Sequence, residues 1–104
     1  MGLTPLGGIM MGTRTGDMDP SVFNYVVSVT GKSAEEVYQM FNKKSGFLGV
    51  SGVGSDNRDV SAACDQGNKR AKLSKDMLVY QIKKYIGAYA AAMNGLDAVL
   101  FTGG

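Results

Sequence analysis

Hydrophobic residues recur at helical spacing through most of the chain and form one continuous run near its end. Apolar positions three or four residues apart predict helices over 20–30, 33–45, 60–67 and 68–93. The run 97–101 does not alternate with polar residues, which predicts a short strand buried on both faces. The expected fold class is therefore mainly α with one short buried strand. The backbone of that strand needs partners that nothing else in the chain clearly supplies.

Capping signals set the ends of these helices. Asp19-Pro20 is typical of a helix start, and Gly31 is typical of a helix end. Ser33 and Glu36 have the spacing of a capping box at the start of the next helix, which we expect Gly46 to end. The first helix is apolar on most sides, so we expect it to be buried between other elements.

Glycines alternate with apolar residues over 46–54, and a polar turn containing Asp56 follows. Spacing alone leaves two interpretations: a backbone cradle for a ligand, or a tight apolar turn before an aspartate-capped helix. The triplet Gly31-Lys32-Ser33 is also how a phosphate-binding P-loop ends. However, position 26 is valine where that motif has glycine, and a helix rather than a strand precedes it, so we do not expect a P-loop.

Composition excludes several classes of site. The 104 residues form one domain at most and include no histidine and a single cysteine, Cys64. Cys/His metal sites, Ser-His-Asp triads and intrachain disulfides are therefore excluded, and Cys64 is expected to be a small buried apolar residue in a cytoplasmic protein. A net charge of +2 does not favour nucleic acid as a partner. No uncharged run approaches the ~20 residues that span a bilayer, so no membrane association is expected.

Arg14 is the only charged side chain among the first sixteen residues, and Gly12 and Gly16 lie on either side of it. Because glycine permits tight turns, the sequence predicts a guanidinium presented from a turn just before a helix. This planar and permanently charged group suits carboxylate or phosphate oxygens, which indicates an anionic substrate or a phosphoryl group in transfer. The local pattern also fits an ordinary solvated turn arginine.

Several separated motifs match one known family in the right order. They are Gly2-Leu3-Thr4-Pro5-Leu6, Met11-Gly12-Thr13-Arg14 with Gly16-Asp17 and Asp19-Pro20, Asn42-Lys43-Lys44-Ser45-Gly46, Ser55-Asp56 with Arg58-Asp59, Lys84-Tyr85-Ile86-Gly87-Ala88-Tyr89, and Asp97-Ala98 with Phe101-Thr102-Gly103-Gly104. On these motifs, the chain resembles the second half of the acetate and propionate kinases over essentially its whole length. The resemblance implies an actin-like α/β parent fold, with two ribonuclease-H-like domains around a nucleotide cleft. Residues 1–104 would be part of its C-terminal nucleotide-binding domain.

The activity that the resemblance implies is reversible transfer of the ATP γ-phosphoryl group to acetate, giving acetyl phosphate and ADP. Mg²⁺ is the expected cofactor beside ATP, and no residue of this chain is assigned as its ligand. Arg14 corresponds to the family arginine that stabilises the transferring phosphoryl group. Such a preorganised guanidinium contributes about 10³-fold or more to the rate in comparable enzymes.

The resemblance also implies nucleotide-binding residues. Asp56, Asn57 and Arg58 correspond to a turn that contacts the adenosine end of the nucleotide. Gly103 and Gly104 correspond to the start of a glycine loop that touches it as well.

Other parts of the family site have no counterpart here, including the catalytic aspartate, the phosphate-contacting histidines, the His-Leu-Gly-Asn-Gly loop and a glutamate tied to Mg²⁺. We therefore expect a portion of a longer kinase that is inactive alone, with the N-terminal domain and the remaining C-terminal part absent. Two alternatives stay open: a propionate or butyrate kinase, and a non-enzymatic helical interaction module in which Arg14 is only a turn residue. Exposed apolar faces predict self-association, as a homodimer or otherwise.

Overall fold

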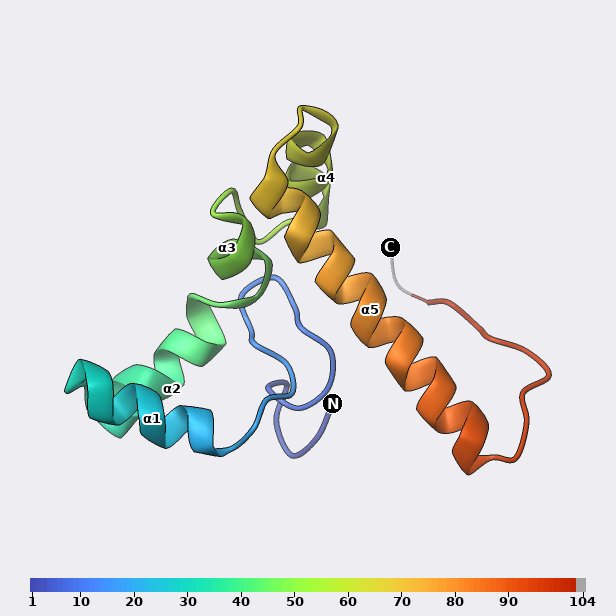
Figure 1. The fold of residues 1–104 in the computed structure, drawn as a ribbon, viewed down its shortest axis with the longest axis horizontal. Helices are drawn as coiled ribbons and strands as arrows, with labels where there is room; N and C mark the ends of the chain where they lie inside the picture. Colours follow the sequence, from blue (N-terminus) through green and yellow to red (C-terminus); the bar gives the residue numbers. More distant parts are fainter. Residues whose placement is uncertain (103–104) are drawn as a thin grey trace.

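The computed structural model describes residues 1–102 and forms an arch of helices. Figure 1 shows two legs that diverge from a central region, with the N-terminal loops lying between them. The α1–α2 pair forms one leg and α5 the other, while α3 and α4 lie where the legs meet. The helices are α1 (Ser21–Thr30), α2 (Ala34–Lys43), α3 (Gly46–Ser51), α4 (Asn57–Asp65) and α5 (Lys69–Ala92).

Side-chain caps explain where the helices begin. The hydroxyl oxygen of Ser33 accepts from the Glu36 N–H at 3.2 Å, and the Ser33 N–H donates to the Glu36 carboxylate at 2.8 Å, which confirms the predicted capping box. The amide oxygen of Asn68 caps α5 by accepting from two backbone N–H groups. Gly31 ends α1 at a φ of 66°, a left-handed conformation that glycine adopts without strain.

The hydrophobic core lies at the top of the arch. Met10, Phe47, Val60 and Ala71 are all buried and pack together, so that the N-terminal loop, α3, α4 and α5 each contribute one residue to this central junction. Cys64 is partly buried and packs against the junction, in keeping with its predicted apolar role. Because α5 packs against both α3 and α4, its first half is the element around which this core assembles.

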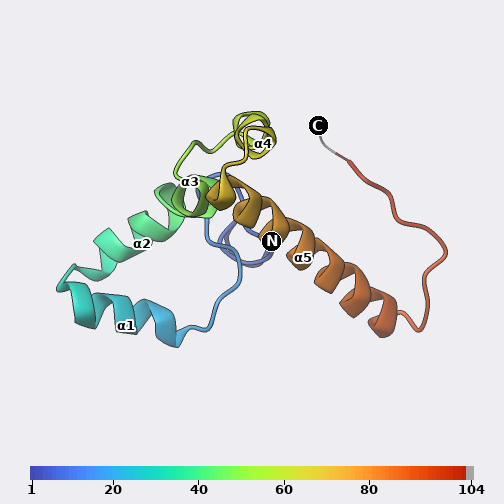
Figure 2. The same ribbon diagram turned by 45° about the horizontal axis from the view of Figure 1, so that its top comes forward.

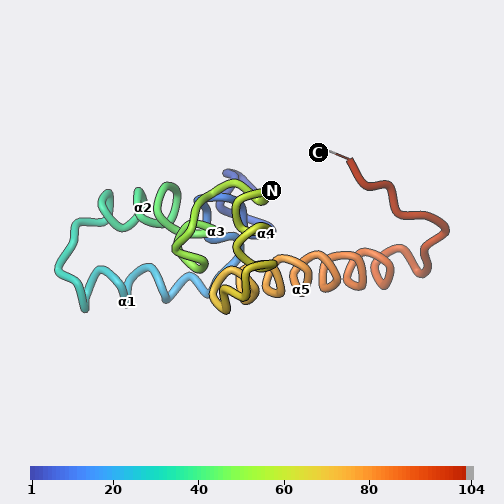
Figure 3. Tube along the Cα trace, turned by 90° about the horizontal axis from the view of Figure 1, so that it is seen from above, coloured from blue at the N-terminus to red at the C-terminus, as the bar shows by residue number. Residues whose placement is uncertain are grey.

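The α1–α2 leg has little support from the rest of the chain. Phe23 and Phe41 join the two helices through an edge-to-face contact with ring centroids 5.8 Å apart. Val37 and Phe41 on α2 are buried, but α1 has no buried residue among those described. The prediction that α1 is buried between other elements is therefore not met within residues 1–102. Figures 2 and 3 show the pair standing away from α5 on the other side of α3.

The predicted strand at 97–101 is wrong for this structure, because residues 1–102 contain no strand at all. Residues 95–102 run as extended or irregular chain, with Leu100 87% and Phe101 76% exposed. A strand exists only where neighbouring strands pair with its backbone groups, and the described residues offer none. The chain turns just before this segment, where Asn94 and Gly95 both have positive φ.

The glycine-rich segment agrees with the second sequence interpretation only at its end, where Asp56 caps α4 by accepting from the Arg58 N–H. Residues 46–51 form a short helix rather than a turn or an open cradle, and Gly46 begins this helix instead of ending the previous one. The next helix begins at Asn57, three residues earlier than its apolar pattern suggests. The helix α5 spans nearly the predicted range, and Leu78 and Ile82 on its inner stripe are partly buried. Among the described residues, no helix is both long and apolar enough to cross a membrane.

Candidate functional site

The turn that carries Arg14 sits on the N-terminus of α3. We call residues 11–14 the arginine turn; it is closed by a hydrogen bond from the Met11 N–H to the Arg14 carbonyl oxygen at 3.1 Å. The carbonyl oxygens of Met11 and Gly12 accept from the Phe47 and Leu48 N–H groups at 3.0 and 2.9 Å. The first N–H groups of a helix have no partner within it, so here the arginine turn supplies the acceptors.

The end of α2 fixes the same turn from a second side. The Ser45 N–H donates to the Thr13 carbonyl oxygen at 2.9 Å, and the Thr13 hydroxyl donates to the Asn42 carbonyl oxygen at 2.7 Å. The Thr15 N–H continues this edge by donating to the Phe41 carbonyl oxygen at 3.2 Å. The backbone around Arg14 is thus held by hydrogen bonds to α2 and to the start of α3.

Two glycines allow this close approach. Gly46 has a φ of 60°, and a Cβ atom added to it would lie 2.0 Å from the Met11 carbonyl oxygen and 2.8 Å from that of Arg14. A Cβ on Gly12 would lie 2.5 Å from the Ser55 carbonyl oxygen. Gly12 therefore brings the arginine turn directly against the start of the Ser55–Arg58 segment, the other predicted part of the site.

The guanidinium of Arg14 has no carboxylate partner among residues 1–102. Its one side-chain contact of hydrogen-bond type is from Nη1 to the sulfur of Met11 at 3.7 Å, which is a weak interaction. The Nε atom is buried and has no acceptor within residues 1–102. Buried donors are usually satisfied, so within the described residues this guanidinium keeps donors free for a further acceptor.

Asp56 and Arg58 form a compact pair at the start of α4. The Asp56 carboxylate accepts from the Arg58 backbone N–H at 2.8 Å and from Arg58 Nη2 at 2.6 Å. The Arg58 side-chain hydrogen bond, followed by its backbone hydrogen bond, lowers the pKa of Asp56 to about 2. Asn57 is the first residue of the helix and adds no side-chain hydrogen bond in the described structure. The Arg58 side chain is 89% exposed, so one face of its guanidinium is open.

The predicted site is therefore brought together in part. The arginine turn meets the segment that begins at Ser55, while Gly103 and Gly104 lie outside the described residues. The sequence predicts that Gly46 ends a helix, whereas in the structure it begins α3 and contacts the arginine turn. The signal that could have indicated this role is that Gly46 belongs to the matched motif Asn42-Lys43-Lys44-Ser45-Gly46.

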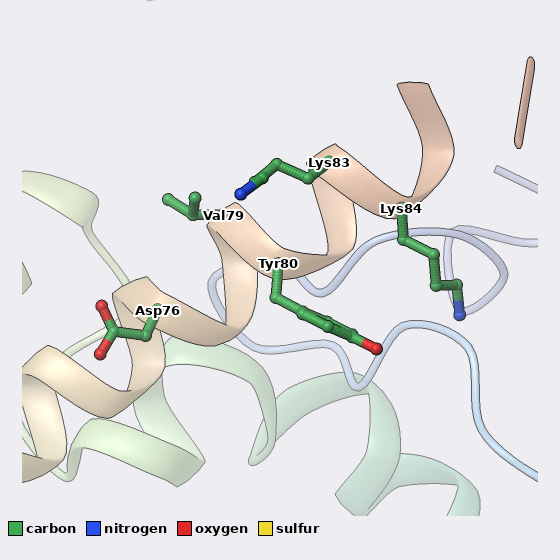
Figure 4. A pocket seen from close by; sticks show the side chains of 5 residues that line it. All are labelled: Asp76, Val79, Tyr80, Lys83 and Lys84. Atoms are coloured by element: carbon green, nitrogen blue, oxygen red, sulfur yellow. The ribbon is translucent and has the colours of Figure 1, made fainter. Parts of the chain in front are cut away.

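The residues present do not form a Mg²⁺ site. Within residues 1–102, no three His, Cys, Asp or Glu side chains gather closely enough to hold a metal ion. A hollow of about 550 Å³ lies along α5, but none of the predicted site residues lines it. Figure 4 shows Tyr80 and Lys84 on one side of this hollow and Asp76 at its other end.

With the fold and the arginine turn described, the class of the protein follows. The chain belongs to the Acetokinase family, whose model matches residues 1–104. Curated relatives are acetate kinases: that of Clostridium botulinum (strain Alaska E43 / Type E3) is 58% identical over 104 residues, and that of Bacteroides thetaiotaomicron is 55% identical. Each match covers the whole of this chain and 26% of the relative, so the chain spans about a quarter of their length.

Solved structures agree with this assignment. Porphyromonas gingivalis acetate kinase matches 93% of the chain with a TM-score of 0.90 and 52% identity, over 24% of its own length. A propionate kinase from Francisella tularensis matches the entire chain with a TM-score of 0.94 and 44% identity, over 27% of its own length. The helical arch is therefore a piece of architecture found within full-length acyl kinases.

Proposed function

We propose that this chain supplies the arginine turn of an acetate kinase, which transfers the γ-phosphoryl group of ATP reversibly to acetate. An acetate oxygen forms a bond to the γ-phosphorus while the bond from that phosphorus to the bridging oxygen of ADP breaks. The observation that carries the proposal is the Arg14 guanidinium, which is fixed by its backbone yet has no carboxylate partner within residues 1–102. Family membership supports it independently.

Arg14 would stabilise the negative charge of the transition state and would not itself form or break a covalent bond. In phosphoryl transfer, negative charge spreads over the equatorial oxygens of the group in flight, and a guanidinium fork can donate two hydrogen bonds to them. A donor that is already oriented needs no rearrangement as that charge develops. The backbone bonds to α2 and α3 provide this orientation, whereas a solvated turn arginine would have none of them.

The Asp56–Arg58 pair would contact the adenosine end of the nucleotide. The Asp56 carboxylate holds the Arg58 guanidinium against the first turn of α4 and leaves one face exposed. A planar guanidinium can stack on an aromatic ring such as adenine. Mg²⁺ is expected with ATP, but we derive no step through the ion, because the residues described here do not gather into a site for it.

A propionate kinase is the second candidate. The observation that favours it is the match of the entire chain to the Francisella tularensis propionate kinase, although that identity of 44% is lower than the 58% to the acetate kinase of Clostridium botulinum. The discrimination between acids of two and three carbons depends on a pocket of matching size. Comparing kcat/KM for acetate and propionate in an active enzyme that contains this chain would choose between them.

A chimera tests the proposal directly. Residues 1–104 replace the matching segment of Porphyromonas gingivalis acetate kinase, and acetyl phosphate formation from ATP and acetate is measured. We expect activity in the chimera and a loss of about 10³-fold or more in kcat for Arg14→Ala. Lys32→Ala, which removes an exposed cation between α1 and α2, is the matched control and should retain kcat. A folded but inactive chimera, or full turnover with Arg14→Ala, would overturn the proposal.

A further inference from the structure

Side chains of helix α5 form hydrogen bonds with the segment that carries Arg14. The side-chain oxygen of Gln81 accepts from the Met10 N–H at 2.7 Å, immediately before the arginine turn. The Tyr85 hydroxyl donates to the Asp17 carboxylate, three residues after Arg14. Gln81 and Tyr85 are four residues apart, so they lie on the same face of the helix, one turn from each other.

Asp17 connects this contact to the other end of the segment. One carboxylate oxygen accepts from the Gly8 N–H at 2.6 Å while the other is bound by Tyr85. The Asp17 N–H returns a bond to the Gly8 carbonyl oxygen at 2.7 Å. Residues 8 and 17 are thereby tied together, and the segment between them is a closed loop with Arg14 inside it. The hydrogen bond from Tyr85, and next that from Gly8, lowers the pKa of Asp17, which keeps the carboxylate ionised as an acceptor.

Packing alone does not hold this loop. One hollow of about 260 Å³ is lined by Thr15, Gly16, Asp17 and Met18, and another of about 390 Å³ is lined by Thr15 and Met18 with residues of α3. The segment after Arg14 thus borders open space on two sides. Hydrogen bonds from α5 add to the bond that Thr15 makes with Phe41 in fixing this segment, and Gly16 permits them by passing close to the backbone of residues 8–10.

We propose that Asp17, Gln81 and Tyr85 form a clamp that positions Arg14 for phosphoryl transfer. None of the three side chains is required to touch the substrate. The clamp acts by fixing both ends of the loop, Met10 through Gln81 and Asp17 through Tyr85, while α2 and α3 hold its middle. This inference rests on the proposed role of Arg14 and adds the residues on which the orientation of Arg14 depends.

The clamp predicts a specific kinetic pattern in the chimera. Tyr85→Phe removes only the hydroxyl, and we expect kcat to fall about 10- to 100-fold with the KM for ATP nearly unchanged, because a displaced guanidinium weakens only the transition state. Gln81→Leu should lower kcat similarly, whereas Gln81→Glu keeps an acceptor oxygen and should restore most of it. Tyr80→Phe, on the exposed face of the same helix, is the matched control and should have wild-type kcat.

A double-mutant cycle separates positioning from general support. In the Arg14→Ala background, we expect Tyr85→Phe to cause little further loss, because the residue that it positions is already gone. Equal losses with and without Arg14 would overturn the clamp. So would a Tyr85→Phe variant that retains wild-type kcat.

Hydrogen exchange tests the clamp without using activity. Peptides covering residues 8–17 should exchange faster in Tyr85→Phe than in Tyr80→Phe, while peptides covering α2 should not change. Unchanged exchange over 8–17 would overturn the clamp even in an active enzyme. An inactive chimera that still shows the faster exchange would count against the proposed kinase function and leave the clamp supported.

Discussion

The top of the arch and its two legs differ in how far their apolar side chains are buried. At the central junction, Met10, Phe47, Val60 and Ala71 are buried against one another, and the loop that carries Arg14 is tied to them by hydrogen bonds. On α1 and α5, large apolar side chains such as Tyr25 and Tyr89 are more than half exposed, and so is Phe101 in the segment after α5. The chain therefore completes its own support for the arginine turn, whereas α1 buries none of its residues within the described structure.

This difference separates two kinds of surface. A small domain buries only part of its apolar area, so scattered exposed residues are ordinary. Here they gather on α1, on the outer face of α5 and on residues 96–101. Large apolar side chains left exposed in groups are typical of surfaces that meet other protein, which fits a chain that spans about a quarter of its relatives. Self-association through these faces stays a prediction.

The largest expected effect comes from emptying the junction. Phe47→Ala should lower the free energy of unfolding by about 3–5 kcal/mol, because a buried ring leaves a cavity that its neighbours only partly fill. Urea denaturation followed by far-ultraviolet circular dichroism measures it. Tyr25→Ala removes an aromatic ring that is mostly exposed on α1, so the free energy of unfolding should change by about 0.5 kcal/mol or less. Comparable losses at the two positions would break the contrast between junction and legs.

The next largest effect is expected from substitution of Gly46, compared with Gly31. Gly46→Ala should destabilise by roughly 3 kcal/mol, because it combines left-handed backbone strain with a Cβ atom 2.0 Å from the Met11 carbonyl oxygen. Gly31→Ala is the matched control: it has a similar φ of 66° but nothing within 4 Å, so about 1 kcal/mol is expected. Differential scanning calorimetry of both variants compares them. If both variants lose the same free energy of unfolding, the arginine turn does not pack against Gly46 as closely as described.

The smallest expected effect is one of pH. The pKa of Asp56 is lowered to about 2 in the folded chain and is about 3.9 in an unfolded one. A carboxyl group whose pKa is lower in the folded state stabilises the fold at pH values above its unfolded pKa. This contribution is lost as the pH falls from about 4 towards 2. Asp56→Asn should therefore reduce the acid sensitivity of the urea midpoint in that range. Identical pH profiles for the two proteins would contradict the pairing of Asp56 with Arg58.

Local signals in the sequence predicted much of the helical structure, because caps act over three or four residues. Ser33 with Glu36, Gly31, and Asn68 before the long helix all lie where their chemistry places them. The strand at 97–101 failed for the opposite reason: its apolar run is a local signal, but pairing depends on strands that residues 1–102 do not contain.

The candidate site was predictable only as far as its motifs reached. Arg14 could be singled out by its isolation among glycines, and the family resemblance gave Asp56 and Arg58 roles that spacing could not. Tyr85, in contrast, fitted an apolar stripe on a helix, and nothing local indicated a bond to Asp17. Contacts between residues 68 positions apart depend on how the loop crosses α5, and periodicity carries no information about that crossing.

The clamp from α5 also has a consequence for synthesis. Domains form during translation from the N-terminus onward, and contacts far apart in sequence form only when both partners have left the ribosome. The segment around Arg14 is made before α5, and its bonds to Gln81 and Tyr85 wait for about seventy further residues. A nascent chain that ends before α5 therefore carries Arg14 without the hydrogen bonds that fix the ends of its loop.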